Sequence, residues 1–298
     1  MKIKKAIIPS AGLGTRLLPA TFAQPKEMLP VGRKPTIQYV VEELANAGIS
    51  DILIITGRNK RAIEDHFDID YTLLENLKQH GKNKLLEQMS FLEKLKVNIF
   101  ITRQSKPTGL ADAVLLGEAF IENEPFAVAL GDTIIKSSKK NNNYLKRLCE
   151  FHLKKNSYGT IGVEPVSLEQ VSKYGIIEGN QDNEGIYKVL NLIEKPLPSE
   201  APSNLAINGR YVFNPEIFDC IKKTKIGIGN ERQLTDSIRI LLDLKKNDIW
   251  AICMKKGEKR YDIGNPLDYA KAFIELCLDD SEIKDDLIIF LKKFIKNL

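Results

Sequence analysis

Short apolar runs alternate with amphipathic segments through the first half of the chain. The apolar runs have the length of buried strands, and the segments between them carry apolar residues at helical spacing, as in Ile37, Val40 and Val41. The predicted strands are 3–8, 51–56, 97–101 and 126–130. Strands that alternate with helices predict a parallel sheet covered by helices on both faces.

The second half of the chain has a different pattern. Short β-rich runs between residues 158 and 213 are separated by Gly, Pro and Asn, which predicts antiparallel additions to the sheet. Residues 281–298 place Ile283, Leu287 and Leu291 on one side of a helix. We therefore expect an α/β fold with a Rossmann-like open mixed sheet, helices on both faces, β-rich additions in the second half and a C-terminal helical tail.

Composition narrows the class of protein. The 298 residues are 43% hydrophobic, enough for a large core, and the net charge of +5 is dispersed along the chain. Dispersed charge favours small polyanionic substrates over nucleic acid. The chain lacks a signal segment and an apolar run of roughly 18 residues, so we expect a cytoplasmic protein without a membrane partner. Four cysteines without metal-ligand spacing are interpreted as core thiols.

A glycine-rich loop directly after the first predicted strand indicates a phosphate site. Glycines let backbone N–H groups approach phosphate oxygens, while Arg16 and Lys26 supply positive charge. Leu17 stands where a dinucleotide fingerprint needs a small residue, and Gly-Lys-Ser/Thr does not occur, so both familiar nucleotide motifs are excluded. The predicted nucleotide-binding residues of the loop are Ala11, Gly12, Leu13, Gly14 and Thr15.

Two acidic residues, far apart in the chain, are candidates for a metal site. Asp132 follows a predicted buried strand, where an open α/β sheet places its ligands, and Asp262 lies in a second β-rich stretch. One or two carboxylates together with substrate phosphates are sufficient for Mg²⁺. Each aspartate taken alone also fits an ordinary turn.

Arg16 and the segment Lys26–Pro30 carry a resemblance to the bacterial UTP–glucose-1-phosphate uridylyltransferases, in the sugar-nucleotidyltransferase superfamily, and it extends through nearly the whole chain. A glutamine amide can pair with the N3–H and a carbonyl of a pyrimidine. Gln104 and Gly109 lie in a segment that resembles the family's Arg-Gln-x-x-Pro-x-Gly-Leu pattern, which implies that Gln104 reads the base. Without the resemblance, the same segment fits a solvated loop and a helix start.

The resemblance also implies a sugar-phosphate site. In the family, the residue at Glu194 contacts sugar hydroxyls and that at Lys195 contacts the sugar phosphate, with Gly175 and Gly209 in the pocket walls. The implied roles of Arg16 and Lys26 are catalytic, on the triphosphate and the departing pyrophosphate. Residues 1–280 would then form one domain, with 1–135 mainly for the nucleotide and 156–265 mainly for the sugar phosphate. Residues 281–298 would be a helix available for oligomer contacts.

The resemblance implies that UTP and α-D-glucose 1-phosphate give UDP-glucose and diphosphate, with Mg²⁺, in a homodimer or homotetramer. A glucose-1-phosphate thymidylyltransferase is the nearest alternative, because glutamine reads uracil and thymine alike. A non-catalytic sugar-nucleotide-binding regulator is an alternative of another class. Phe22, Asp112 and Thr133 depart from the family pattern, which leaves the preference between UTP and dTTP and the breadth of sugars open.

Overall fold

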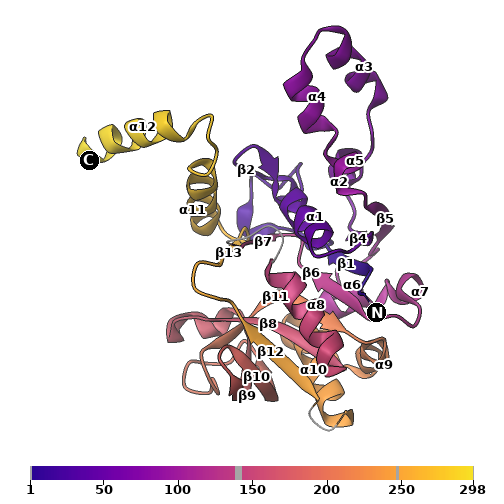
Figure 1. Cartoon of the computed structure of the whole chain (residues 1–298). Coiled ribbons are helices and arrows are strands. Elements are labelled where there is room, and N and C mark those ends of the chain that lie inside the picture. The colour runs from indigo at the N-terminus through magenta and orange to yellow at the C-terminus, as the bar shows by residue number, and fades with distance from the viewer. Residues whose placement is uncertain (1, 138–142, 246–247, 298) are drawn as a thin grey trace.

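The computed structural model describes residues 2–137, 143–245 and 248–297 (Figure 1). Within these residues a nine-stranded sheet forms the centre, with the strand order β5-β4-β1-β6-β11-β8-β12-β10-β9. Its strands are β1 (Lys5–Pro9), β4 (Asp51–Thr56), β5 (Asn98–Arg103), β6 (Phe126–Ala129), β8 (Gly159–Pro165), β9 (Gly175–Asn183), β10 (Ile186–Glu194), β11 (Leu205–Phe213) and β12 (Ile249–Cys253).

Strand direction divides the sheet into two parts. Strands β5, β4, β1 and β6 are parallel, as the alternating pattern predicts. Strand β11 runs antiparallel to both β6 and β8, and β9 and β10 form an antiparallel pair at the far edge. The predicted open mixed sheet with antiparallel additions in the second half is confirmed, and β11 joins its two parts.

Alternate residues of the central strands point to opposite faces of the sheet and build two separate cores. Ile7 packs in a cluster that contains residues of α6, α7, α9 and α10, whereas Ala6 and Ile8 pack in a cluster with α1, α2 and α8. These helices are α1 (Thr36–Asn46), α2 (Arg61–His66), α6 (Leu110–Leu115), α7 (Glu118–Ile121), α8 (Tyr144–Lys155), α9 (Glu216–Lys223) and α10 (Leu234–Leu244). Helices therefore cover both faces, as expected.

A smaller unit lies beside the sheet at the carboxyl ends of the parallel strands. It consists of β2 (Pro30–Val31), β3 (Lys34–Pro35), β7 (Thr133–Lys136), β13 (Lys259–Asp262) and α11 (Pro266–Cys277). Short 3-10 helices lie outside this unit, at η1 (Thr15–Leu17), η2 (Lys26–Met28), η4 (Leu168–Lys173) and η5 (Ile228–Asn230). Strands β7 and β13 pair antiparallel, and Val31, Ile134 and Tyr261 pack in one cluster with α11. This pairing brings the segments that carry Asp132 and Asp262 together.

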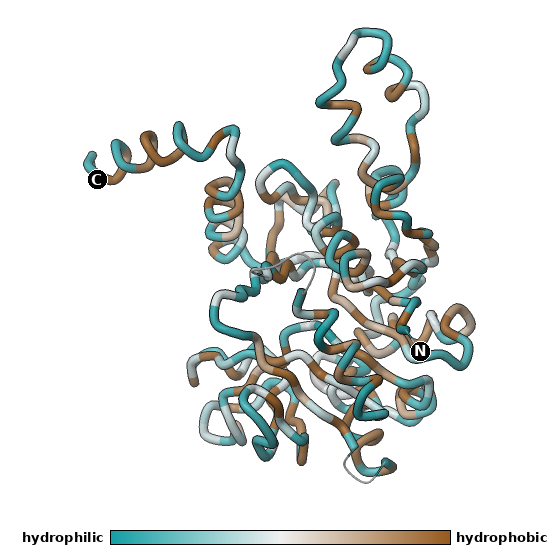
Figure 2. The backbone as a smooth tube through the Cα atoms, viewed as in Figure 1, coloured by the Kyte–Doolittle hydropathy of each residue, from teal (hydrophilic) through white to brown (hydrophobic). Residues whose placement is uncertain are grey.

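Two helical segments extend from the body (Figure 1). The first comprises α3 (Tyr71–Gln79), α4 (Asn83–Met89) and α5 (Phe91–Leu95), and Gly81, with a φ of 64°, lies between α3 and α4. The second is α12 (Lys284–Lys296), on which Ile289, Phe290 and Ile295 remain more than half exposed. Figure 2 shows apolar segments along this projecting helix. Across the described residues, none of the helices combines the length and apolar character needed to cross a lipid bilayer.

Candidate active site

The loop after β1 turns sharply and lies beside Lys26. Gly14 has a φ of 70°, in the left-handed region that favours glycine, and its carbonyl accepts a hydrogen bond from the Thr21 hydroxyl at 2.8 Å. The Ser10 amide donates to the Ile55 carbonyl at 2.8 Å, which holds the start of the loop against β4. A Cβ atom at Gly12 would lie 3.7 Å from the Lys26 ammonium. Lys26 is thus in contact with the loop predicted to bind phosphate.

Four charged side chains from distant parts of the chain meet at this edge of the sheet. The Lys26 ammonium lies 2.5 Å from Oδ2 of Asp132, directly after β6. Asp262 ends β13 opposite Thr133, so the ladder brings its carboxylate close to Asp132. A Cβ atom at Gly264 would lie 2.7 Å from both the Arg16 guanidinium and Oδ1 of Asp262. The structure therefore brings together Arg16, Lys26, Asp132 and Asp262.

The protonation of these groups follows from burial and from their neighbours. Burial acts to raise the pKa of Asp132, but the Lys26 ammonium outweighs it, so the pKa lies below the ordinary value. Burial likewise acts to lower the pKa of Lys26, but Asp132 and Glu27 outweigh it and the pKa is raised. Burial, and then the charge of Asp132, raise the pKa of Asp262. A bound cation would therefore stabilise the charged form of Asp262, whereas the charged form of Asp132 is already stabilised by Lys26.

These residues fit a divalent metal. Two carboxylates face each other closely enough for one to raise the pKa of the other, and carboxylate oxygens are the ligands that Mg²⁺ prefers. Within the described residues no group of three or more His, Cys, Asp or Glu side chains forms a metal cage. A pair of carboxylates suits an ion that also binds substrate phosphates.

A buried ion pair next to Lys26 was not predicted from the sequence. Glu27 and Lys60 are almost fully buried, and the Lys60 ammonium lies 2.8–2.9 Å from both carboxylate oxygens of Glu27. The pair joins η2 to the segment after β4. Glu27 belongs to the Lys26–Pro30 motif, but nothing around Lys60 in the sequence marks it as a partner.

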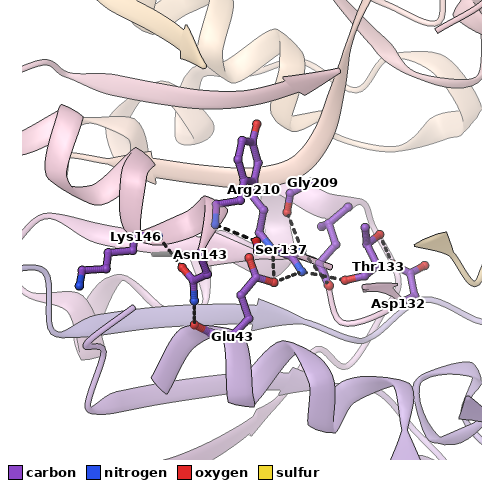
Figure 3. A network of polar contacts seen from close by, with 10 residues as sticks. Glu43, Asp132, Thr133, Ser137, Asn143, Lys146, Gly209 and Arg210 are labelled. Carbon is purple, nitrogen blue, oxygen red and sulfur yellow. Dashed lines mark hydrogen bonds and ion pairs between the residues drawn. The ribbon is translucent and has the colours of Figure 1, made fainter. Parts of the chain in front are cut away.

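A buried arginine supports the turn that carries Asp132. Arg210 on β11 is fully buried and donates to Glu43 on α1 at 2.8 Å and to the Thr133 carbonyl at 2.7 Å (Figure 3). The Gly209 carbonyl accepts from the Leu130 amide at 3.1 Å, just before Asp132. Gly209 has a φ of 85°, and a Cβ atom there would lie 2.8 Å from the Leu130 side chain. Gly209 therefore lies next to the aspartate turn.

Gln104 and Gly109 lie together in the loop after β5. The Gln104 side chain is 8% exposed, and its amide donates to the Gly109 carbonyl at 3.3 Å. Gly109 has a φ of 125°, and a Cβ atom there would lie 2.5 Å from the Arg232 carbonyl oxygen. A glycine is required both by this conformation and by the close approach of Arg232.

The three remaining predicted sugar-phosphate residues also converge. Gly175 and Glu194 are partners in the β9–β10 ladder, and the Thr235 hydroxyl donates to Oε2 of Glu194 at 2.7 Å. The Lys195 ammonium lies 3.4 Å from Oε1 of Glu194. A Cβ atom at Gly175 would lie 2.8 Å from the Thr235 hydroxyl, so this pocket wall has no room for a side chain. Thr235 is a contact that the sequence did not indicate.

A cavity of about 240 Å³ lies beside Asp262 and reaches Tyr174, the residue before Gly175. Its lining includes Tyr174, Arg260 and Asp262. The Arg260 guanidinium lies 4.5 Å from the centre of the Tyr174 ring, and the Tyr174 carbonyl accepts from the Lys195 amide at 3.0 Å. The segment that carries Lys195 is therefore joined to the segment that carries Asp262.

The positions that depart from the family pattern have distinct environments. The carboxylate of Asp112 forms an ion pair with the Arg232 guanidinium. Phe22 is 85% exposed, beyond the phosphate loop. Thr133 is buried, and its hydroxyl lies 3.4 Å from Oδ1 of Asp132. Of the three, Asp112 has the strongest side-chain interaction.

Comparisons with known proteins agree with this geometry. The nucleotidyl transferase family model matches residues 5–277. The UTP–glucose-1-phosphate uridylyltransferase YngB of Bacillus subtilis (strain 168) is 49% identical over 297 residues, which cover 99% of this chain and 96% of that protein. A UDP-glucose pyrophosphorylase complexed with UDP-glucose has a TM-score of 0.81 at 41% identity, covering 93% of this chain and 100% of that one.

A UTP-bound UGPase from Acinetobacter baumannii has a TM-score of 0.86 at 34% identity and covers 99% of each chain. Sequence and structure thus agree along nearly the full length of the chain, including the segments that carry the charged cluster. This chain belongs to the nucleotidyl transferase family.

Proposed function

We propose that the chain joins UTP and α-D-glucose 1-phosphate to give UDP-glucose and diphosphate. The observation that carries the proposal is the meeting of Arg16, Lys26, Asp132 and Asp262 beside the glycine-rich loop. The names of the similar proteins support UTP as the nucleotide and glucose as the sugar. The chain is therefore an enzyme, a UTP–glucose-1-phosphate uridylyltransferase in its activity.

The reaction is an in-line attack of the sugar phosphate on the α-phosphorus of the nucleotide. A phosphate monoester is largely ionised at neutral pH, so the attack needs alignment and charge neutralisation rather than a general base. In this proposal the amides of residues 11–15 hold the triphosphate, and Arg16 and Lys26 neutralise the charge that develops on the leaving pyrophosphate. Lys26 is aligned by its ion pair with Asp132, and the charge of the buried Glu27 nearby further favours the ammonium form.

Transferases of this kind typically use a divalent metal, and we assign Mg²⁺ to Asp132 and Asp262. Bound there, Mg²⁺ would supply positive charge to the phosphate oxygens during transfer. The raised pKa of Asp262 supports the assignment, because this buried carboxylate lies near another negative charge. Asp262 pairs with Thr133 in the β7–β13 ladder, and the Ile263 amide donates to the Asp132 carbonyl at 3.0 Å, so the backbone fixes the separation of the two aspartates.

Substrate recognition divides between the two parts of the sheet. In the nucleotide part, residues 1–135, Gln104 reads the pyrimidine and Gly109 leaves room beside it. In the sugar-phosphate part, residues 156–265, Glu194 accepts hydrogen bonds from sugar hydroxyls, Lys195 neutralises the phosphate, and Gly175 and Gly209 shape the walls. Residues 1–280 form one domain in this assignment, because β11 pairs with strands of both parts.

The test is release of pyrophosphate from UTP, dTTP, CTP, ATP or GTP with a panel of sugar 1-phosphates. We expect UTP with glucose 1-phosphate to give the highest kcat/KM. One thymine methyl is worth only about 1–3 kcal/mol of discrimination, so measurable use of dTTP is expected as well. A higher kcat/KM with dTTP would establish the thymidylyltransferase alternative. Binding of UDP-glucose without any turnover would establish the regulatory alternative.

We also assign the protein to a homodimer or homotetramer, with α12 of one copy contacting another. Four apolar side chains of this projecting helix support the assignment: Ile289, Phe290, Phe294 and Ile295, each more than half exposed. The face proposed from the sequence is only partly available, because Ile283, Leu287 and Leu291 are half-buried. Truncation before Ser281 should lower the number of subunits in the assembly, as calculated from the mass measured by light scattering, while activity persists. An unchanged number of subunits would refute this role of α12.

We assign a cytoplasmic location on the basis of the proposed substrates, which are phosphorylated metabolites.

A further inference from the structure

The segment from Arg232 to Thr235 contacts the nucleotide loop at one end and the sugar-side carboxylate at the other. It leads from η5 into the first turn of α10. Leu234, between the two ends, is 2% exposed and belongs to the core cluster beneath the sheet. The segment is therefore anchored in the protein interior while its two ends contact different parts of the site.

The contact with the nucleotide loop is made by both backbone and side chain. The Arg232 amide donates to the Thr108 carbonyl at 2.8 Å, and the Arg232 carbonyl accepts from the Ala111 amide at 3.2 Å. These bonds enclose Gly109, at which a Cβ atom would lie 2.5 Å from the Arg232 carbonyl oxygen. The guanidinium pairs with Asp112 on α6. Arg232 is thus fixed to the loop that carries Gln104.

The contact with the sugar side is made by the Thr235 hydroxyl. Thr235 is 6% exposed, and its hydroxyl donates to Oε2 of Glu194 at 2.7 Å. The opposite oxygen of Glu194 lies 3.4 Å from the Lys195 ammonium. The threonine therefore holds one carboxylate oxygen and leaves the other directed toward Lys195.

We propose that Arg232 and Thr235 are positioning residues that set the sugar-binding carboxylate of Glu194 relative to the nucleotide loop. The inference rests on the proposed function. Transfer requires the sugar phosphate to lie in line with the α-phosphorus, and small displacements of either substrate are costly. One short segment that is bonded to both subsites fixes their separation. Asp112 anchors it, at a position where this chain departs from the family pattern.

The first test is Asp112→Asn, which removes a charge on the nucleotide side and keeps the shape of the side chain. We expect the KM for UTP to rise roughly 3- to 10-fold, as for a weakened charge-assisted hydrogen bond. Because Arg232 continues into Thr235, the KM for glucose 1-phosphate should also rise by about threefold. The matched control is Glu118→Gln, at an ion pair with Lys222 that joins α7 to α9. Both KM values should stay within about twofold there.

The second test is made on the sugar side and compares Thr235→Val with Thr235→Ser. Valine has the shape of threonine without the hydroxyl, so the KM for glucose 1-phosphate should rise about 10-fold. Serine retains the hydroxyl and should restore the KM to within about twofold of the parent. A role in stability alone would lower the amount of folded enzyme and the apparent kcat without this selective change in KM.

Circular dichroism and thermal unfolding of each variant determine how the kinetics are interpreted. If Asp112→Asn does not fold, the comparison of the two Thr235 variants carries the test. A KM for glucose 1-phosphate unchanged in folded Asp112→Asn would overturn the inference, as would equal losses in Thr235→Val and Thr235→Ser. In either case an active parent would leave the proposed function standing. A parent without activity on UTP and glucose 1-phosphate would overturn both.

Discussion

Replacing Glu43 by leucine should destabilise the protein strongly, because it leaves the charge of Arg210 buried without a counterion. Arg210 has no exposed surface, and among the described residues its guanidinium would keep the carbonyl oxygens of Thr133 at 2.7 Å, Gly209 at 3.3 Å and Leu130 at 3.5 Å as acceptors. Removing one partner of a buried ion pair costs about 3–5 kcal/mol of unfolding free energy. At about 2 °C per kcal/mol for a chain of this length, Tm should fall by about 6–10 °C.

Urea unfolding followed by circular dichroism measures this loss, and pyrophosphate release at low temperature measures its effect on the site. The control is Glu87→Leu, the same change at an exposed pair with Lys94, which should stay within about 0.5 kcal/mol of the parent. The double variant Glu43→Leu, Arg210→Met removes both charges and should lose less than the sum of the single variants. A loss below about 1 kcal/mol in Glu43→Leu would refute the reasoning, as would additive losses in the double variant.

The remaining predictions concern turnover, base choice and pH. Arg16→Ala should lower kcat by roughly 10²-fold with an unchanged circular dichroism spectrum, as expected for one lost preorganised charge; full activity would exclude the assigned role. Asp132→Asn and Asp262→Asn should each cripple turnover, and the double variant should lose far less than the product of the two effects if both act through one ion; fully multiplicative losses would separate their roles. Gln104→Ala should raise the KM for UTP and flatten the preference for pyrimidines over ATP, so equal kcat/KM ratios before and after the change would exclude Gln104 as the base reader. Burial lowers the pKa of His152 below 6.5, so the unfolded chain takes up this proton first as pH falls. The free energy of unfolding should therefore fall below about pH 6.5, by up to about 1.4 kcal/mol per pH unit, and the slope of urea midpoints should be smaller in His152→Gln; an unchanged slope would contradict this origin.

The local pattern of the chain predicts most of the fold because strand and helix periodicity reflect burial directly. The strand predicted at 51–56 is β4 itself, and the strand predicted at 3–8 is shifted to Lys5–Pro9 in β1. The ends differ because hydrogen bonding to β4 and β6, rather than hydrophobicity, decides where β1 begins and ends. The predicted antiparallel additions are present, but the pairing of β11 with β6 requires three-dimensional information that no local pattern contains.

The candidate site was predictable where a motif surrounded each residue. Arg16, Lys26 and Asp132 lie in such segments, and the structure brings them together. The supporting ion pairs could not be predicted, because Lys60 meets Glu27 only after β4 has packed beside the phosphate loop. The same holds for the pairing of Asp112 with Arg232, which lie 120 positions apart in the chain. These partners depend on tertiary packing rather than on spacing along the sequence.

The central position of β11 has a consequence during synthesis. Strand β6 ends at Ala129, yet its antiparallel neighbour begins only at Leu205. At about 5–20 residues per second, the ribosome needs roughly 4–15 s to make the intervening chain. During that interval the four parallel strands have an open edge at β6, with unpaired backbone groups of the kind that promote association between chains. We therefore expect the nascent first half to be prone to aggregation, and faster elongation between residues 130 and 205 should reduce aggregation during expression.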